Sequence, residues 1–96
     1  MDKVRNKSVD NLMRVIAKMS SADDCYDFFE DLCTVKEIKD MSQRLEVAVL
    51  LSKGLSYQKV SELTNVSSAT ISRVKRCLDY GSGGYTKALA AMEEDK

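Results

Sequence analysis

No proline interrupts the 96 residues of this chain, and its four glycines all lie at position 54 or later. Proline and glycine are the residues that most disfavour the interior of a helix. Their absence from the first half of the chain therefore favours long helices over strands and turns. The length fits one domain, which would bury only a modest core. We expect an all-α fold, and whether copies of the chain associate to enlarge that core stays open at this point.

Composition narrows the functions that this chain can have. With 44% hydrophobic and 31% charged residues, it should be globular and soluble. It has no long apolar run and no signal-peptide pattern, so we expect a cytoplasmic protein without contact to a membrane. Histidine is absent, and Cys25, Cys33 and Cys77 lack metal-ligand spacing. We therefore expect reduced thiols, no metal site, no cofactor and no catalytic residues of the His-based kind.

The net charge is zero, but the charges are distributed unevenly along the chain. Residues 53–76 hold five basic residues and one acid, which is a local charge of +4. Residues 21–40 hold seven acids and two basic residues, which is a local charge of −5. The local sign decides whether a surface attracts phosphate. The first 20 residues carry +3, and the acidic segment would weaken the attraction of a nearby basic segment for phosphate.

The first half of the chain has the pattern of three helices. Apolar residues recur at helical spacing between positions 9 and 19 and predict the first helix. Ser20 or Ser21 can cap the second, whose early aspartates complement the positive end of the helix dipole. Thr34 and Glu37 have the spacing of a capping box, which opens the third helix.

The third helix is expected to end before Gly54, because glycine readily adopts the left-handed conformation that closes a helix. Its inward positions are predicted to be Ile38, Met41, Leu45 and Val49, with Ala48 and Leu51 as further candidates. Residues 1–53 would thus form a helical body with either solvated acidic faces or apolar stripes that meet a second chain. A short last helix is predicted over residues 85–93.

Asn65 lies where a single helix would otherwise continue through the basic segment. Ser56 can cap a helix over residues 57 to 63 or 64. Asn65 is one of the few non-glycine residues that tolerate a positive φ angle. Ser67 or Ser68 can then cap a new helix. We therefore predict a tight turn between two helices.

The segment 56–78 fits the frame of a helix-turn-helix motif. Ser61 is the small residue expected where the two helices touch, and Asn65 takes the place of the usual turn glycine. Thr64 is a polar residue at a position that is more often apolar. The apolar positions on both helices and just after the turn hold Val60, Val66, Ile71 and Val74.

The second helix of this motif has two different faces when it is plotted at about 100° per residue. Ile71, Val74 and Leu78 form the apolar face. The opposite face is small, polar and basic, and consists of Ser68, Ala69, Ser72, Arg73 and Arg76. Small residues let a helix approach base edges, hydroxyl groups donate or accept, and arginine binds guanine or phosphate. The alternative interpretation is an ordinary helical hairpin with a solvated polar face.

The candidate DNA-binding residues come from this face and from the two helix starts. Ser67 and Ser68 could serve only as caps, and Lys59 and Lys75 could be solvated surface residues. Gln58 lies at the start of the first helix of the motif, where phosphate contacts often fall. The predicted DNA-binding residues are Gln58, Ser67, Ser68, Ala69, Ser72, Arg73 and Arg76.

The run ATISRVKRCLDYGSGGY resembles the Trp repressor superfamily, and in particular its YerC/YecD branch. The preceding LLSKGLSYQKVSELTNVSS supports the match, and the resemblance covers most of the chain. It implies one domain over residues 1–96, with six helices in an interlocked homodimer whose two recognition helices enter successive major grooves. It also implies that Ser68, Ala69 and Ser72 face bases and that Gln58, Ser67 and Thr70 lie near phosphates. Thr70 is left out of our candidates because the helical plot puts it on the flank.

The resemblance fails at the tryptophan site of the family. The tryptophan binders use one Arg on the third helix and an Arg, a Gly and a Ser on the recognition helix. The matching positions here hold Gln43, Arg73, Val74 and Cys77. The carboxylate of tryptophan would lose one cationic partner, and a branched side chain fills the indole slot, so we expect no tryptophan binding. Arg73 stays open between a DNA contact and a vestigial pocket residue.

Together these features predict a homodimeric, sequence-specific regulator of transcription, a repressor that binds double-stranded DNA without tryptophan. The alternative is a dimeric helical protein-interaction module that has kept the fold and lost operator binding, which the net neutrality and the acidic second helix favour. An enzyme is not expected, because no nucleophile is paired with a base and no carboxylates flank a cleft. The sequence predicts no particular small-molecule effector.

Overall fold

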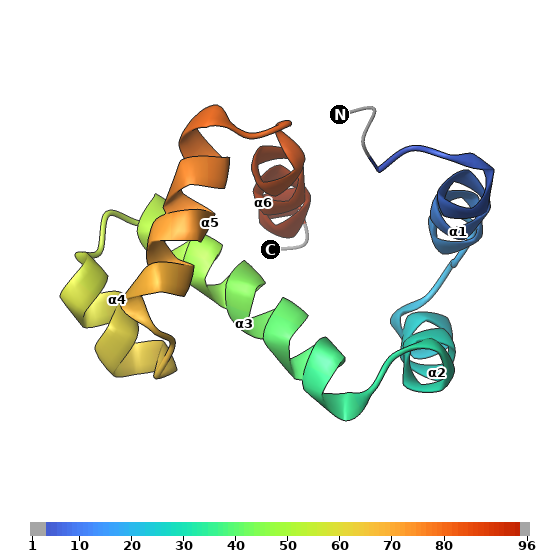
Figure 1. The fold of residues 1–96 in the computed structure, drawn as a ribbon, viewed down its shortest axis with the longest axis horizontal. Helices are drawn as coiled ribbons and strands as arrows, with labels where there is room; N and C mark the ends of the chain where they lie inside the picture. The colour runs from blue at the N-terminus through green and yellow to red at the C-terminus, as the bar shows by residue number, and fades with distance from the viewer. Residues whose placement is uncertain (1–3, 95–96) are drawn as a thin grey trace. The chain divides into compact units, whose positions relative to one another are not determined.

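The computed structural model describes residues 4–94 and contains, within that range, six α-helices and no strand (Figure 1). The helices are α1 (Lys7–Ala17), α2 (Ala22–Leu32), α3 (Val35–Ser52), α4 (Tyr57–Thr64), α5 (Ser68–Tyr80) and α6 (Gly84–Glu94). The predicted all-α fold is confirmed. In the described part of the chain, no helix combines the length and the apolar character that crossing a bilayer requires.

The chain divides into two compact units, one with the residues up to Ile38 and one with the residues from Lys39 onward. The boundary falls within α3, so this helix contributes residues to both units. The functional division that the sequence suggests, into a dimerisation body, a DNA-binding segment and a last helix, stays a prediction.

The first unit contains α1, α2 and the start of α3, and its apolar side chains are only partly covered. Ser21 caps α2, because its hydroxyl oxygen accepts a hydrogen bond from the Asp24 N–H at 3.1 Å. Neither α1 nor α2 has a buried residue. Met13 is 55% exposed and Tyr26 is 65% exposed, although both belong to helices with a clear apolar stripe. The stripe therefore lies open within this unit.

The start of α3 is held by the predicted capping box. The Glu37 N–H donates to the Thr34 hydroxyl at 3.1 Å, and the Thr34 N–H donates to a Glu37 carboxylate oxygen at 2.8 Å. Two backbone groups that a helix start leaves without partners are thus satisfied reciprocally. The hydrogen bond from the Thr34 backbone lowers the pKa of Glu37, because it stabilises the charged carboxylate.

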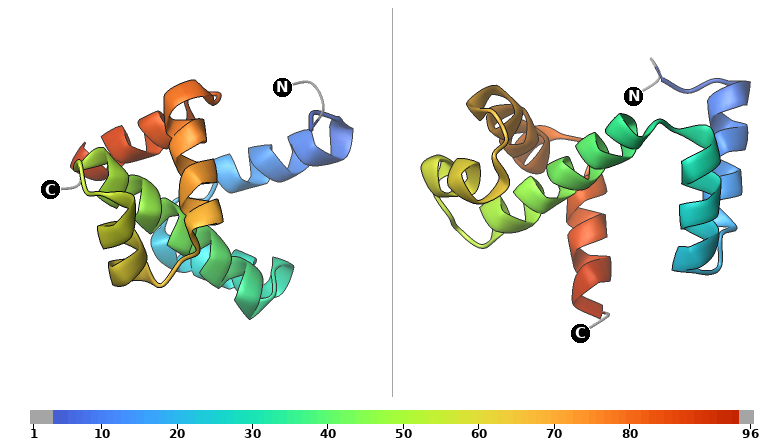
Figure 2. Two further views of the ribbon diagram at one scale, coloured as in Figure 1. Left: turned by 60° about the vertical axis from the view of Figure 1, so that its left-hand side comes forward. Right: turned by 90° about the horizontal axis from the view of Figure 1, so that it is seen from below.

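The second unit has a small apolar core built by α3, α4, α5 and the turn between the last two. Its buried residues are Val47, Ala48, Leu51, Val60, Val66, Ile71 and Val74, and Leu50, Leu55, Leu78 and Tyr85 pack against them. In Figure 1 and in both views of Figure 2, α4 and α5 gather around the C-terminal half of α3. This core fixes which face of α5 points inward.

The inward face of α3 differs from the prediction. The further candidates Ala48 and Leu51 are buried as predicted, but Val47, which the sequence did not single out, is fully buried beside them. The predicted inward residues Ile38, Met41, Leu45 and Val49 are only half-buried. The reason is that α3 is apolar over two adjacent faces, and only one of them is used by the core of the second unit. The other face keeps apolar surface accessible along the helix.

Two glycines allow the chain to leave its helices. Gly54 follows α3 with a φ angle of +87°, in the left-handed region, as predicted. Gly81 ends α5, where its N–H donates to the Cys77 carbonyl oxygen at 2.9 Å. A Cβ atom at Gly81 would lie only 2.4 Å from that oxygen, so a larger residue would force the backbone to move. Both positions therefore require glycine for different physical reasons.

Candidate nucleic-acid interface

The helix break predicted at Asn65 is confirmed. Ser56 caps α4, because its hydroxyl oxygen accepts from the Lys59 N–H at 3.1 Å. Asn65 then takes a φ angle of 59° and a ψ angle of 28°, and it is the only non-glycine residue with positive φ in the described range. Its N–H donates to the Ser61 carbonyl oxygen at 2.8 Å, which closes the helix. The chain therefore reverses into α5 within a few residues.

Ser67, and not Ser68, caps α5. The Ser67 hydroxyl oxygen accepts from the Thr70 N–H at 3.2 Å and also donates to the Thr70 hydroxyl oxygen at 3.1 Å. Its single donor is therefore occupied in this structure, and Ser67 would have to exchange a bond before it could donate to a phosphate. Ser68 is exposed and has no part in the cap, so its hydroxyl is available to a ligand.

The two faces of α5 lie as the helical plot predicts. Ile71 is fully buried and Val74 is 1% exposed, while Leu78 packs against the core. The opposite face is exposed along its whole length and comprises Ser68, Ala69, Ser72, Arg73 and Arg76. We call these five residues the outer face of α5. Their exposure makes them accessible, and their role in binding DNA stays a prediction.

The cations near this face differ in whether they already have a partner. Lys75 lies 3.3 Å from an Asp79 carboxylate oxygen, and Lys59 lies 4.0 Å from one of Glu62. Within residues 4–94, Arg73 and Arg76 form no such ion pair. The two arginines are therefore free to meet an external anion, whereas the lysines must first leave weakly bound carboxylates.

Gln58 is exposed in the first turn of α4, next to Tyr57, which is 42% exposed. Its amide can therefore reach a ligand, and it lies on a different helix from the other candidates. Of the positions that match the tryptophan site, Val74 is in the core, Cys77 and Arg73 are exposed, and Gln43 is half-buried.

Sequence reasoning missed the hydrogen bonds that hold the turn between α4 and α5. The Thr64 hydroxyl donates to the Val60 carbonyl oxygen at 2.7 Å and accepts from the Val66 N–H at 3.3 Å. The Ser61 hydroxyl donates to the Val66 carbonyl oxygen at 3.2 Å. The tendency of Ser and Thr to bond the carbonyl four residues earlier was the available signal for Thr64.

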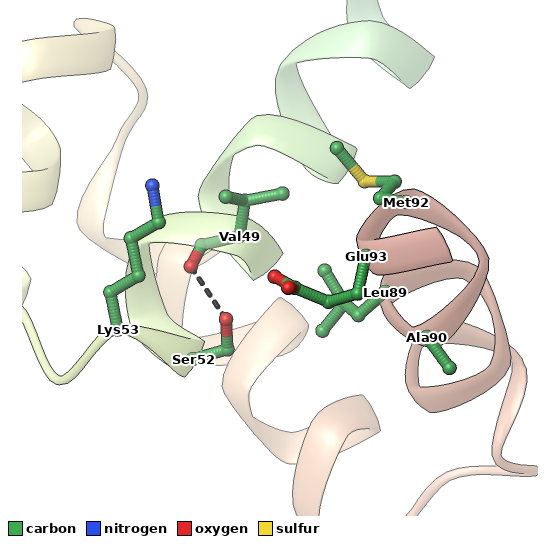
Figure 3. A pocket seen from close by; sticks show the side chains of 7 residues that line it. All are labelled: Val49, Ser52, Lys53, Leu89, Ala90, Met92 and Glu93. Atoms are coloured by element: carbon green, nitrogen blue, oxygen red, sulfur yellow. Dashed lines mark hydrogen bonds between the residues drawn. The ribbon is translucent and has the colours of Figure 1, made fainter. Parts of the chain in front are cut away.

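Open apolar pockets occur in each of the two units. One, of about 440 Å³ in the first unit, is lined by Ile16, Ala22, Cys25, Tyr26, Phe29 and Ile38. The other, of about 400 Å³, lies between the end of α3 and α6, where Val49, Leu89 and Met92 supply its apolar lining (Figure 3). Both are surfaces on which apolar atoms meet solvent.

The family model described as Trp repressor protein matches residues 7–93. The chain belongs to the Trp repressor family. Members of this family are DNA-binding regulators, typically dimeric, and not enzymes. Among its relatives, the uncharacterized protein YerC of Bacillus subtilis (strain 168) is 48% identical over 94 residues, which are 98% of this chain and 90% of YerC.

Crystal structures in the Trp repressor family have the same fold as this chain. That of a TrpR-like protein from Eubacterium eligens ATCC 27750 superimposes with a TM-score of 0.91 at 41% identity, over 97% of this chain and 96% of the other. That of a Staphylococcus aureus protein gives a TM-score of 0.90 at 42% identity, over 96% and 92%. The six-helix Trp-repressor-like fold and the similarity to YerC are therefore as predicted.

Proposed function

We propose that this protein is a cytoplasmic, sequence-specific repressor of transcription that binds double-stranded DNA as a homodimer. In this proposal α4, the turn at Asn65 and α5 act as a helix-turn-helix motif. The observation that carries it is the outer face of α5, which is small, polar and cationic while the opposite side is locked into the core. Membership of a DNA-binding family supports the same conclusion.

The outer face of α5 has the chemistry needed to read a major groove. Ser68, Ala69 and Ser72 are short, so the helix can approach base edges closely, and the two hydroxyls can donate or accept. Arg73 and Arg76 can bind phosphate or guanine, and they have no competing ion pair in the described chain. Gln58 and Ser67 would contact phosphates near the starts of α4 and α5.

A homodimer gives the open apolar surfaces a partner. The first unit exposes an apolar pocket, and the second face of α3 continues into the pocket beside α6. A second copy of the chain can cover both, which supplies the core that one short chain lacks. Two α5 helices related by a two-fold axis would then read half-sites about 10 base pairs apart.

Tryptophan is not expected to control this protein. Val74 takes the position of the family glycine, and its side chain is a buried part of the core. Gln43 replaces the Arg of the third helix, so the carboxylate would keep only Arg73 as a cationic partner. Calorimetry with L-tryptophan should therefore give no binding heat, and DNA affinity should be the same with and without it.

The variant R73A/R76A tests the DNA-binding proposal. Affinity for a duplex selected by the wild-type protein from a random library should fall by about tenfold or more. The slope of log affinity against log salt should decrease by about one for each lost phosphate contact. Fluorescence anisotropy over a range of salt concentrations measures both quantities.

The control is R5A/R14A, which removes the same charge from exposed positions in or beside α1. Equal losses in the two variants would mean that total charge, and not the outer face of α5, causes binding. Failure of the wild-type protein to select any duplex at low salt would contradict the proposed function.

A dimeric protein-interaction module is the second candidate function, and the exposed acidic side chains of α2 favour it. Asp23, Asp24, Asp27, Glu30 and Asp31 all face solvent. Such a module would keep its protein partner in R73A/R76A, whereas a repressor would lose DNA. The same variant therefore separates the two functions.

A further inference from the structure

The turn between α4 and α5 is held on both sides of Val66. The Val66 N–H donates to the Thr64 hydroxyl oxygen at 3.3 Å, and the Val66 carbonyl oxygen accepts from the Ser61 hydroxyl at 3.2 Å. Both hydroxyls are partly buried, and Val66 itself is 9% exposed. The backbone of Val66 is therefore fixed by two side chains of α4 and by its own packing.

Thr64 uses its hydroxyl in two directions at once. Besides accepting from the Val66 N–H, it donates to the Val60 carbonyl oxygen at 2.7 Å, in the preceding turn of α4. A hydroxyl group has one donor and two acceptor sites, so a single oxygen can join the end of α4 to the first residue beyond the turn. An isosteric valine would fill the same space and leave the Val66 N–H without this partner.

Val66 directly precedes Ser67, whose hydroxyl caps α5. Holding Val66 therefore fixes where α5 begins relative to α4, because only the cap residue Ser67 lies between Val66 and α5. The side chains of Val60, Val66 and Ile71 meet in the core and fix the spacing of the two helices. The hydroxyl bonds add a directional constraint that apolar packing alone does not supply.

We propose that Thr64 and Ser61 are positioning residues, which form a hydroxyl latch on Val66 that sets the angle of α5 to α4 and thereby the fit of α5 to its DNA site. This inference rests on the proposed function, but Thr64 and Ser61 are not among the proposed DNA-binding residues. It predicts that removing one hydroxyl weakens specific binding more than non-specific binding, because non-specific binding depends mainly on charge.

The test compares Thr64→Val, which keeps the shape and removes the hydroxyl, with Thr64→Ser, which keeps the hydroxyl. Affinities are measured for the duplex selected by the wild-type protein and for an unrelated duplex of equal length. In T64V, affinity for the selected duplex should fall by about tenfold, and affinity for the unrelated duplex should change much less. T64S should restore specific binding, and S61A should repeat the defect of T64V.

Equal affinity of T64V and wild type for the selected duplex would overturn the inference, and so would equal losses on both duplexes. Amide hydrogen exchange measured by NMR tests the latch independently of DNA binding, so a failure of the latch can be told from a failure of the proposed function. If the wild-type protein selects no duplex, the DNA-binding proposal fails, but the exchange rate of the Val66 N–H still tests whether the latch exists. Its exchange should be faster in T64V than in T64S relative to the Ile71 and Val74 amides, and an unchanged ratio would exclude the latch.

Discussion

Arg73 and Val74 are neighbours in the sequence, yet they lie on different faces of α5. Val74 is 1% exposed and belongs to the core, whereas Arg73 is exposed on the outer face. Successive residues of a helix are about 100° apart, so one step along the chain changes the environment completely. Substitutions at adjacent positions should therefore separate effects on folding from effects on binding.

Val74→Ala should lower the free energy of unfolding by about 1–3 kcal/mol, because it removes buried methyl groups and leaves a cavity. Val35 is the matched control, since the same residue type is 84% exposed at the start of α3. Val35→Ala should change stability by less than about 0.5 kcal/mol. Urea unfolding followed by circular dichroism measures both. Equal effects of the two variants would mean that Val74 does not pack in the native core.

At the scale of single elements, the capping box of α3 makes this helix start sensitive to acid. The Glu37 side chain accepts the hydrogen bond from the Thr34 N–H more strongly when it is charged than when it is protonated. Its pKa in the folded protein lies below the ordinary value of 4.5, so the folded state holds the proton less tightly than the unfolded state. The resulting stabilisation is complete above the ordinary pKa and is lost as the pH falls through the lowered one.

Glu37→Gln should keep the capping geometry, because glutamine also serves at this position of a capping box. As the pH is lowered from 5 to 3, the free energy of unfolding should fall less in E37Q than in wild type. Unfolding by urea at a series of pH values gives the comparison. Parallel stability curves for wild type and E37Q over this range would show that Glu37 does not contribute to the acid sensitivity.

How far the sequence predicts these elements depends on whether the signal is local. The caps at Ser21, Thr34, Ser56 and Ser67 and the left-handed Asn65 follow from short-range rules, and they are confirmed. The burial of Val47 was missed because α3 is apolar on two adjacent faces and periodicity does not say which one the core uses. The hydrogen bonds of Thr64 were missed because the position is usually apolar in a helix-turn-helix motif, and Thr64 was interpreted only as a departure from that pattern.

The same distinction applies to the candidate site. The exposure of the outer face of α5 follows from helical periodicity, and it is confirmed for all five of its residues. Which of them would contact bases or phosphates depends on the position of α5 against DNA. In the proposed homodimer, that position would be set by the turn and by the second chain, and neither leaves a periodic signal in the sequence.

At the scale of the whole molecule, two compact units each leave apolar surface in solvent. Tyr26 is 65% exposed at the pocket of the first unit, and Met92 is 42% exposed at the pocket beside α6. Apolar surface of this kind, which includes no residue of the outer face of α5, suits association of two chains. The proposed homodimer would make stability depend on protein concentration.

Tyr26→Asp should shift the protein from dimer to monomer, because a carboxylate would have to be buried at the proposed contact between chains. Tyr80 provides the control, since it is 86% exposed and lines neither pocket. Tyr80→Asp should leave the oligomeric state unchanged. Sedimentation velocity at several concentrations distinguishes the outcomes. A wild-type protein that stays monomeric at high concentration would contradict the homodimer.

Ser68, Ala69 and Ser72 contribute nothing to the core, so the demands of folding leave these three sites free to vary. Exchanges at exposed helical sites usually cost little stability. If α5 reads DNA as proposed, a descendant of this protein can acquire new target sequences by single steps while its scaffold stays intact. Because the residues that would recognise DNA are different from those that form the core, the sequence of α5 can change in evolution without loss of the fold.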